Sequence, residues 1–348
     1  MSDPDLHLSS YDYFLPEELI AQNPADQRQN SRLLVYQQAS GDIHHSQFYH
    51  IHNWLKPGDL LVLNDTKVFP ARIFGQKSHT GTRFEFLLTR QIEHNHWQAM
   101  AKNSKRIRAG YHFDFAENVS AEVLSNPDNG LIELKFHPIP DDDFWSWLER
   151  HGEIPYPPYI SARETEAERY QTVYSREPGS VAAPTAGLHF TPELLADLKA
   201  RGIDHVYVTL HVGIGTFSPV RTEQIVEHQM HSELYQMPAE TAVRLNQQRE
   251  SGQRIIAVGT TATRTLETVW RKYDQRFAAD EGETDIFIYP GQPIGAIDGL
   301  ITNFHLPCST LLMLVSALIG REKLLDMYQI AIAEKYRFYS FGDATLLI

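Results

Sequence analysis

Apolar and polar positions alternate in two different ways along this 348-residue chain. Residues 11–65, and the chain again beyond residue 143, mix short apolar runs with segments of helical periodicity, as in domains that carry helices on a sheet. Residues 69–140 contain short alternating runs, separated by Gly- and Asn-containing turns and spaced roughly ten to fifteen residues apart. The pattern predicts an α/β main domain, residues 1–68 with 151–348, and an inserted small all-β barrel domain, residues 69–150.

The apolar runs also predict the individual elements. Residues 59–64 are apolar through their middle, which is typical of a strand buried on both faces. Elsewhere in the main domain we expect strands at 32–36, 206–210, 254–258, 285–289 and 300–302, a mixed connector at 43–55, and helices at 16–21, 239–251, 261–272, 310–319 and 323–336. In the insert we expect strands at 71–75, 83–88, 96–101, 111–115, 120–124 and 131–136, and a tight turn at Asn129-Gly130. The α/β pattern then resumes with an amphipathic helix at 143–151.

Residues 181–191 form the most unusual stretch, Val-Ala-Ala-Pro-Thr-Ala-Gly-Leu-His-Phe-Thr. It has little bulk to bury and suits neither a helix nor a strand. Thr191 is a favourable N-cap with Pro192 at the first helical position, so we expect a helix that begins here and stops at Gly202. Small residues that lead to a helix N-terminus allow a ligand to approach the backbone closely, and His189 adds a proton-transfer group.

Polar or glycine-rich clusters follow several of the expected strands. They are residues 64–67, 211–217, 259–264 and 303–307. Ligands of open α/β sheets bind beyond the carboxyl ends of the strands. We therefore expect these clusters to line one crevice together with residues 181–191.

Two motifs also suggest other chemistry. Gly213-Ile-Gly215 lacks the third glycine and the following helix of a dinucleotide-binding fingerprint, which argues against that function. His228, His231 and Glu233 are spaced so that a metal site is conceivable, but a His-Glu-x-x-His order and paired cysteines are missing. An acid/base or ribose-binding role of His231 and Glu233 is the favoured interpretation.

Charge is distributed unevenly over the chain. The formal net charge is −13, which argues against indiscriminate binding of nucleic acid. Residues 67–108, however, contain nine basic residues against Glu85 and Glu93, a local charge of +7. The densest part is 102–108, with Lys102, Lys105, Arg106 and Arg108, and it is either a solvated hairpin edge or a phosphate-binding surface.

The remaining composition indicates a cytoplasmic protein. Cys308 is the single cysteine, so no internal disulfide is possible, and no Gly-x-Ser-x-Gly nucleophile elbow is present. Residues 1–10 are polar and acidic, unlike a signal peptide. The longest apolar run, 311–319, is too short to span a bilayer and predicts a buried helix. We expect no membrane association.

Taken together, these segments resemble the S-adenosylmethionine:tRNA ribosyltransferase-isomerase family of queuosine biosynthesis. The resemblance runs from residue 11 to the C-terminus, with Tyr156 and residues 1–10 as small departures. It is carried by YDYFLPE (11–17), LVLNDTKVFPAR (61–72), HGEIPYPPYI (151–160), YQTVY (170–174), residues 179–191, TLHVGIGTF (209–217), HQMHSE (228–233), AVGTT (257–261), LITNFHLP (300–307) and YRFYSFGDA (336–344).

The resemblance implies a transferase that moves the ribosyl part of S-adenosylmethionine onto 7-aminomethyl-7-deazaguanine at the tRNA wobble position. The ribose is isomerised, epoxyqueuosine forms, and adenine and methionine leave. S-adenosylmethionine is then consumed as a substrate, with no cofactor and no metal. The partners would be S-adenosylmethionine and a tRNA that carries this base in its anticodon, and we expect a monomer. The family fold is likewise an α/β domain with an inserted β-barrel.

This chemistry needs a general base next to the sulfonium, a general acid for adenine, and carboxylates or aromatic rings near the positive charge. The sequence does not say which residue transfers which proton. The candidate catalytic residues are His189, His211, His231, His305, Asp65 and Glu233. The candidate substrate-binding residues are Asn64, Thr185, Gly187, Phe190, Gly213, Gly215, Phe217, Thr260, Thr261 and Asn303, and the candidate tRNA-binding residues are Lys102, Lys105, Arg106 and Arg108.

Two alternatives remain at this point. A non-enzymatic RNA-binding protein would explain the basic segment but not the polar clusters after the strands. A metal-dependent hydrolase would use His228, His231 and Glu233. Release of adenine from S-adenosylmethionine in the presence of substrate tRNA distinguishes the ribosyltransferase from an RNA-binding protein. Activity that is insensitive to a chelator argues against the metal-dependent hydrolase.

The basic segment generates the first testable prediction. Neutralising Lys102, Lys105, Arg106 and Arg108 together should weaken tRNA binding and flatten its salt dependence, because fewer counterions are released from the RNA. Affinity measured at several salt concentrations checks this expectation. Unchanged affinity would show that the segment is only a solvated edge.

Overall fold

The structure is a computed structural model that describes residues 3–128, 130–137, 144–160, 167–213, 215 and 220–348. The chain forms two compact units, each described here by itself. The α/β unit comprises Met1–Thr66, Pro158–Glu177 and Ala183–Ile348. The barrel unit comprises Lys67–Pro157 and, in addition to the inserted stretch expected from the sequence, Pro178–Ala182. The predicted fold class, α/β with a small inserted β-barrel, is confirmed.

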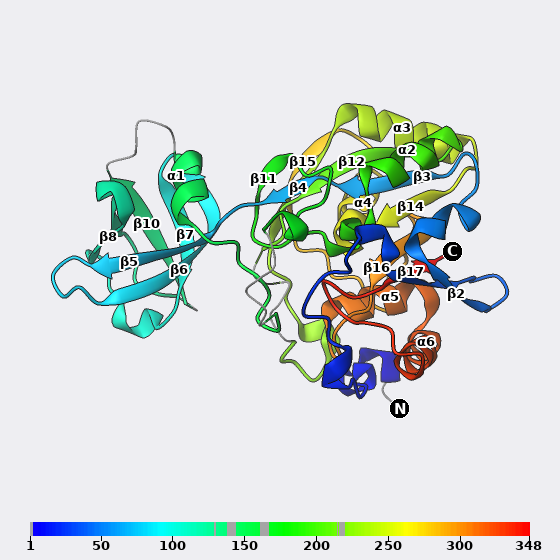
Figure 1. Ribbon diagram of the computed structural model, residues 1–348, viewed down its shortest axis with the longest axis horizontal. Coiled ribbons are helices and arrows are strands. Elements are labelled where there is room, and N and C mark those ends of the chain that lie inside the picture. Colours follow the sequence, from blue (N-terminus) through cyan, green and yellow to red (C-terminus); the bar gives the residue numbers. More distant parts are fainter. Residues whose placement is uncertain (1–2, 129, 138–143, 161–166, 214, 216–219) are drawn as a thin grey trace. The chain divides into compact units, whose positions relative to one another are not determined.

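The α/β unit is built on a nine-stranded sheet of order β15-β13-β12-β3-β14-β16-β17-β1-β2 (Figure 1). Its central strands β12, β3, β14 and β16 are parallel, and β17 is antiparallel to β16. As expected, β3 is buried at every position. The strands are β1 Arg32–Tyr36, β2 Ile43–Gln47, β3 Leu60–Asn64, β12 Asp204–Leu210, β13 Glu233–Met237, β14 Ile255–Val258, β15 Asp280–Thr284, β16 Gly299–Asn303 and β17 Ala344–Leu347.

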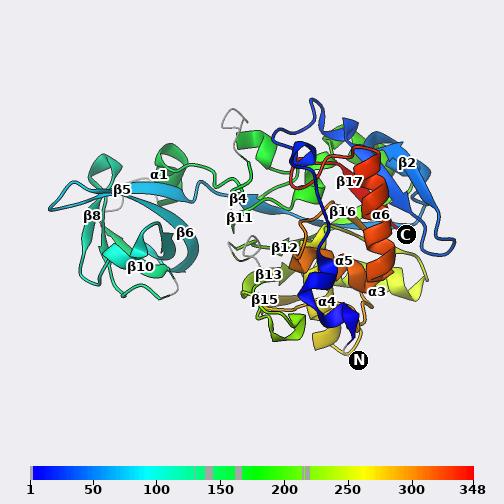
Figure 2. The same ribbon diagram turned by 90° about the horizontal axis from the view of Figure 1, so that it is seen from below.

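Helices pack against this sheet. Leu194 and Leu198 of α2 join a buried cluster with Leu61 and Leu63 of β3, and α4 contacts the central strands β12, β3 and β14. Helices α5 and α6 lie side by side (Figures 1 and 2). None of the helices in the described ranges combines the length and hydropathy needed to cross a bilayer. The helices are α2 Pro192–Ala200, α3 Ala239–Glu250, α4 Thr260–Lys272, α5 Thr310–Ile319 and α6 Arg321–Ala333.

The small-residue stretch differs in part from expectation. Thr191 caps α2 by accepting a hydrogen bond from the Leu194 amide at 3.2 Å, and Gly202 follows the helix at φ +80°, so the helix prediction is confirmed. Before it, however, Thr185–His189 forms a short 3-10 helix, η9. Within this stretch the Gly187 amide donates a hydrogen bond to the Pro184 carbonyl.

Three strands of the nine-stranded sheet, and the separate pair β4 and β11, differ from the sequence-based expectation, and one predicted strand was misplaced. The prediction of a strand at 285–289 is wrong. The edge strand β15 is instead Asp280–Thr284, an acidic segment that pairs with β13. β13 itself was missed, since its buried alternate positions begin with the charged Glu233. β2 was hidden in the predicted connector, which also contains a 3-10 helix at Phe48–Asn53, and β17 was missed.

The barrel unit is a closed barrel of order β10-β7-β6-β5-β8-β9. Side chains alternate between its interior and its surface, as in β10, and the interior contains a group of aromatic rings among aliphatic side chains. Phe86 lies 4.9 Å from Phe113 in an edge-on contact, and Phe136 packs on Phe144 of α1 at 4.7 Å. The elements are β5 Arg72–Lys77, β6 Arg83–Glu93, β7 His96–Ala101, β8 His112–Asp114, β9 Ser120–Val123, β10 Leu131–His137 and α1 Phe144–His151; β4 Thr66–Val68 and β11 Glu177–Ser180 pair separately.

These aromatic rings should dominate the stability of the barrel unit. Phe86→Ala should destabilise it by about 3–5 kcal/mol, because the fully buried ring leaves a cavity. Ile92→Ala is the matched control in the same strand; its side chain is 42% exposed, and the expected change is within about 0.5 kcal/mol. Urea unfolding followed by tryptophan fluorescence measures both. Equal effects of the two variants would contradict the role given to the aromatic rings.

Candidate functional site at the carboxyl edge of the sheet

The parallel strands β3, β12, β14 and β16 end at the same edge of the sheet, here called the carboxyl edge. The clusters expected to follow these strands therefore lie along one edge: Asn64 ends β3, His211 follows β12, Gly259 follows β14 and Asn303 ends β16. The η9 segment reaches the same edge, because Thr185 Oγ1 donates to Asn303 Oδ1 at 3.2 Å.

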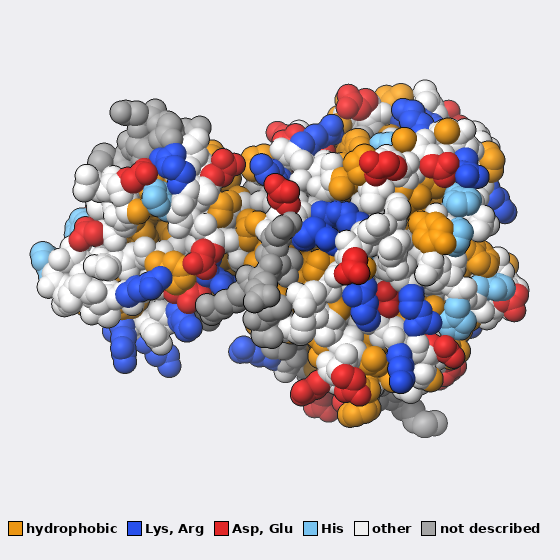
Figure 3. All heavy atoms as spheres, viewed as in Figure 1, with side chains coloured by type: hydrophobic (Ala, Val, Ile, Leu, Met, Phe, Trp, Pro, Cys, Tyr) orange, Lys and Arg blue, Asp and Glu red, His pale blue; other side chains and the backbone are white. Residues whose placement is uncertain are grey.

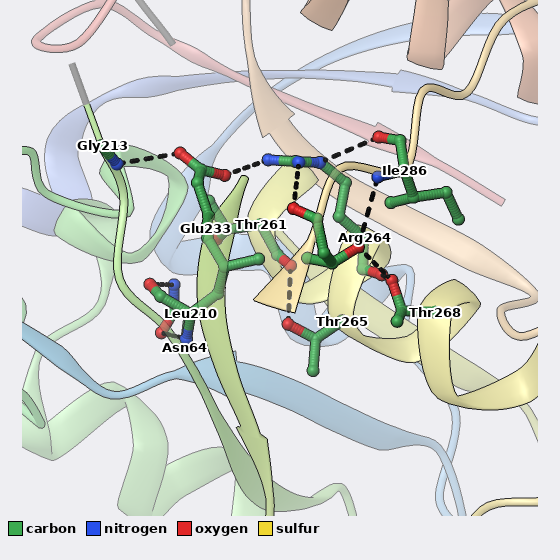
Figure 4. Close-up of polar contacts among 10 residues, drawn as sticks. Asn64, Leu210, Gly213, Glu233, Thr261, Arg264, Thr265, Thr268 and Ile286 are labelled. Carbon is green, nitrogen blue, oxygen red and sulfur yellow. Dashed lines mark hydrogen bonds and ion pairs between the residues drawn. The ribbon is translucent and has the colours of Figure 1, made fainter. Parts of the chain in front are cut away.

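The Asn64 side chain joins the end of β3 to the end of β12 by hydrogen bonds. Its side-chain amide donates to the Leu210 carbonyl at 3.0 Å and accepts from the Leu210 amide at 3.1 Å (Figure 4). The same oxygen accepts from the Thr66 amide at 3.2 Å. The fully buried side chain thus continues the hydrogen-bond ladder beyond the end of β3. This arrangement supports a role in fixing the edge rather than in contacting a substrate.

His211 is half-buried at the end of β12, and its Nδ1 lies 2.8 Å from Thr66 Oγ1. Burial lowers the pKa of His211, against the opposing charge of Asp65. The ring is therefore neutral near pH 7. Among the described residues no partner of Nε2 is found. His211 combines an orienting contact on one ring nitrogen with a second nitrogen that can accept a proton.

Asp65, the residue after β3, uses both of its carboxylate oxygens in contacts with other side chains. One oxygen accepts from Thr209 Oγ1 at 2.7 Å, and the other pairs with Arg176 Nε at 2.7 Å. The Arg176 guanidinium also covers the Tyr207 ring at 4.7 Å. Asp65 is buried, and its negative charge raises the pKa of His211 against the larger effect of burial.

Glu233 and Arg264 form a buried ion pair at the start of β13 (Figure 4). The other Glu233 oxygen accepts from the Gly213 amide at 2.9 Å. Arg264 further donates to the Ile286 carbonyl at 3.3 Å. Removing either partner of such a pair leaves an uncompensated buried charge, so the pair holds the segment after β12 in place.

Two glycines, one after β12 and one in η9, allow close packing. A Cβ at Gly215 would lie 2.2 Å from the ring of His231, which is exposed, and one at Gly187 would lie 2.1 Å from Tyr174 Oη. Both glycines thus permit a close approach of backbone and side chain. Phe217, predicted to bind substrate, lies outside the described residues.

His189 is buried and both of its ring nitrogens are occupied. Nε2 accepts from Asn303 Nδ2 at 3.2 Å, which places the ring proton on Nδ1, 2.7 Å from Ser31 Oγ. Burial, followed by the charges of Arg337 and Arg28, lowers the pKa of His189 to about 3. The ring stacks on Phe48. This geometry supports a positioning role for His189, which orients Asn303 at the end of β16.

His305 and Phe190 are also enclosed by the protein. His305 Nε2 lies 2.9 Å from Thr302 Oγ1, its carbonyl accepts from Tyr13 Oη, and burial lowers its pKa to about 3. Phe190 is fully buried in the core against Phe48. The placement of both residues supports packing rather than contact with a ligand.

Thr260 and Thr261 occupy the first turn of α4, after Gly259 at φ +89°. Thr261 Oγ1 is buried and has no hydrogen-bond partner within the described ranges. Amides at a helix N-terminus favour a negatively charged group. The turn therefore has the features of a site for an anionic group.

The described residues contain no group of three or more His, Cys, Asp or Glu side chains placed to hold a metal ion. His228 instead packs edge-on against Phe287 at 5.5 Å. In the barrel unit, Lys102, Lys105, Arg106 and Arg108 are all exposed, and Figure 3 shows Lys and Arg side chains gathered along one edge of that unit.

Several residues of the edge were not singled out from the sequence. Thr66, Thr209 and Arg176 contact His211 or Asp65, and Arg264 pairs with Glu233. Thr66 and Arg264 lie inside segments already noted, so their position after a strand was a usable signal. Ser31 precedes a strand, and nothing in its surroundings in the sequence indicates its contact with His189.

The buried histidines predict a pH-dependent stability. His305 titrates near 6.5 when unfolded but near 3 when folded, so the unfolded state binds more protons between these values. Stability is fully present above pH 6.5 and falls as the pH drops. His305→Gln should reduce the slope of the free energy of unfolding against pH by up to about 1.4 kcal/mol per pH unit. The contribution of His189 to that slope should remain. Urea unfolding at pH 7, 6 and 5 tests this; an unchanged slope would contradict it.

The chain is similar to known proteins over almost its whole length. A family model described as queuosine biosynthesis protein matches residues 8–347. S-adenosylmethionine:tRNA ribosyltransferase-isomerase of Staphylococcus haemolyticus is 52% identical over 346 residues, covering 99% of this chain and 100% of that protein. The protein of the same name from Staphylococcus saprophyticus is 51% identical over 344 residues, with the same coverage.

A solved structure is also similar. The crystal structure of S-adenosylmethionine tRNA ribosyltransferase from Thermotoga maritima is 38% identical, with a TM-score of 0.56, and the match covers 97% of this chain and 100% of that one. The similarity therefore extends over both units and is not confined to a motif. By its family match and its full-length relatives, the chain belongs to the queuosine biosynthesis protein family.

Proposed function

We propose that this chain is an S-adenosylmethionine:tRNA ribosyltransferase-isomerase. It transfers the ribosyl part of S-adenosylmethionine to 7-aminomethyl-7-deazaguanine at the wobble position of a tRNA and isomerises it, releasing adenine and methionine. The observation that carries the proposal is the full-length identity of about one half to relatives of that name. The polar carboxyl edge, where open α/β sheets bind ligands, is consistent with it.

Within this proposal, His211 is the proton-transfer group. It is neutral near pH 7 and half-buried, it is oriented by Thr66, and its Nε2 is available among the described contacts. The α4 N-terminus with Thr261 would receive the carboxylate of S-adenosylmethionine. His189, Asn64 and Glu233 act as positioning residues, because their polar atoms already bond to neighbouring groups. His231, which is exposed beside Gly215, is the remaining candidate for a second proton transfer.

The names of the relatives support neither alternative function. A protein that only binds RNA would not release adenine, and a hydrolase that used His228, His231 and Glu233 would lose its activity in a chelator. The same assay therefore separates all three functions when it is run with and without chelator.

The enzyme should release adenine from S-adenosylmethionine only when the modified tRNA is present. His211→Gln should lower kcat by about 100-fold or more, as expected for loss of a general base. His205→Gln is the matched control, because His205 lies near the opposite end of the same strand and should leave kcat unchanged. Chromatographic quantification of adenine measures both. If the wild-type protein released no adenine, the proposed function would be wrong; full activity of His211→Gln would remove only its assigned role.

A further inference from the structure

Three arginines from distant parts of the sequence converge on one small cavity in the α/β unit. Arg28, Arg169 and Arg337 line it together with Ser31, His189 and the turn at 340–342. The cavity has a volume of about 20 Å³, enough for a single oxygen-sized group. None of the three arginines belongs to the clusters that follow the parallel strands.

These guanidinium groups are bound mainly by backbone carbonyls. Arg28 donates to the carbonyls of Leu188 at 3.3 Å and Glu168 at 2.8 Å. Arg169 donates to those of Asp26, at 3.2 Å, and Ala25. Carbonyl oxygens orient a guanidinium group but do not neutralise its charge.

Among the described residues, an ion pair with a carboxylate is found for only one of the three arginines. Arg337 lies 3.4 Å from Asp343, whose carboxylate also accepts from the Arg32 and Arg337 amides. Within the described residues, neither Arg28 nor Arg169 has an ion-pair partner. Arg169 Nε is buried without a hydrogen-bond partner among them.

The positive charges act on each other and on their surroundings. Burial and then the charge of Arg169 lower the pKa of Arg28. Burial, with the charges of Arg337 and Arg28, lowers the pKa of His189. Like charges held this close repel one another unless an anion offsets them. The cluster is therefore complementary to an oxyanion, which guanidinium groups bind in a fork of parallel hydrogen bonds.

We propose that Arg28, Arg169 and Arg337 bind one phosphate of the tRNA backbone. The inference rests on the proposed function. The cavity is too small to admit a whole nucleotide or S-adenosylmethionine, so the ligand stays outside and presents an oxygen to the three guanidinium groups. A phosphate on a polymer meets this condition, and phosphate contacts commonly set the position of a nucleic acid on its protein.

The cavity is connected to the carboxyl edge by one side chain. His189, which lines the cavity, is linked through Nδ1 to Ser31 and through Nε2 to Asn303 at the end of β16. A phosphate bound by the arginines would therefore be held at a fixed position relative to the strand ends. The site would set the register of the RNA and leave the chemistry to other residues.

The test uses the full-length protein and an anticodon stem-loop RNA. Arg169→Gln and Arg28→Gln keep hydrogen-bond donors but remove a charge, and each should weaken RNA binding about tenfold and reduce the salt slope by about 0.7–0.9. The KM for S-adenosylmethionine should not change. Arg201→Gln is the matched control, since Arg201 forms an exposed pair with Asp197 on α2, and it should bind RNA like the wild type. Thermal unfolding confirms that each variant is folded.

A second measurement does not depend on the variants. A series of stem-loops is prepared, each with a neutral methylphosphonate at a different backbone position. At one position the replacement should weaken RNA binding by the wild-type protein about tenfold but leave RNA binding by the Arg169→Gln variant unchanged. No such position, or a raised KM for S-adenosylmethionine with unchanged RNA affinity in Arg169→Gln, would overturn the proposal. If the wild-type protein releases adenine while these results fail, only the phosphate site is refuted; if it neither binds RNA nor releases adenine, the proposed function fails as well.

Discussion

The parallel pairing of β12, β3, β14 and β16 is the constraint on which the candidate site depends. Because the four strands run in the same direction, their carboxyl ends meet at one edge, and segments almost two hundred residues apart, such as β3 and β14, become neighbours. β3, β14 and β16 are buried at every position, and this burial disfavours a shift of their register. The positions of the polar residues at the carboxyl edge therefore depend on the pairing of these strands.

The edge is polar and yet closely packed, and this determines the roles of its residues. Buried polar groups need partners, and the structure supplies them: the Leu210 backbone for Asn64, Gly213 and Arg264 for Glu233, and Ser31 and Asn303 for His189. Side chains engaged in this way form a rigid support. His211 and the first turn of α4 retain polar groups that a ligand can contact. We therefore assign the proposed chemistry to these residues and a positioning role to the others.

Much of the fold could be predicted from the sequence, for physical reasons. β3 is apolar because it is buried on both faces, α2 begins at Thr191 because of its cap, and the barrel strands alternate because one face is interior. β15 and β13 could not be found in the same way, since an acidic edge strand and a strand with a buried glutamate break the apolar pattern. The site was predictable at the level of segments, because the position after a strand is visible in the sequence. The burial of His189 and the meeting of Arg28, Arg169 and Arg337 were not, because they depend on long-range packing.

A crystal structure of the protein with S-adenosylmethionine bound would test the assignment of the site. The ligand should lie at the carboxyl edge of the sheet, with its carboxylate at the first turn of α4 and its ribose within reach of His211 Nε2. His189 should keep its contacts to Ser31 and Asn303. A ligand bound at the opposite edge of the sheet, or in the barrel unit, would contradict the assignment.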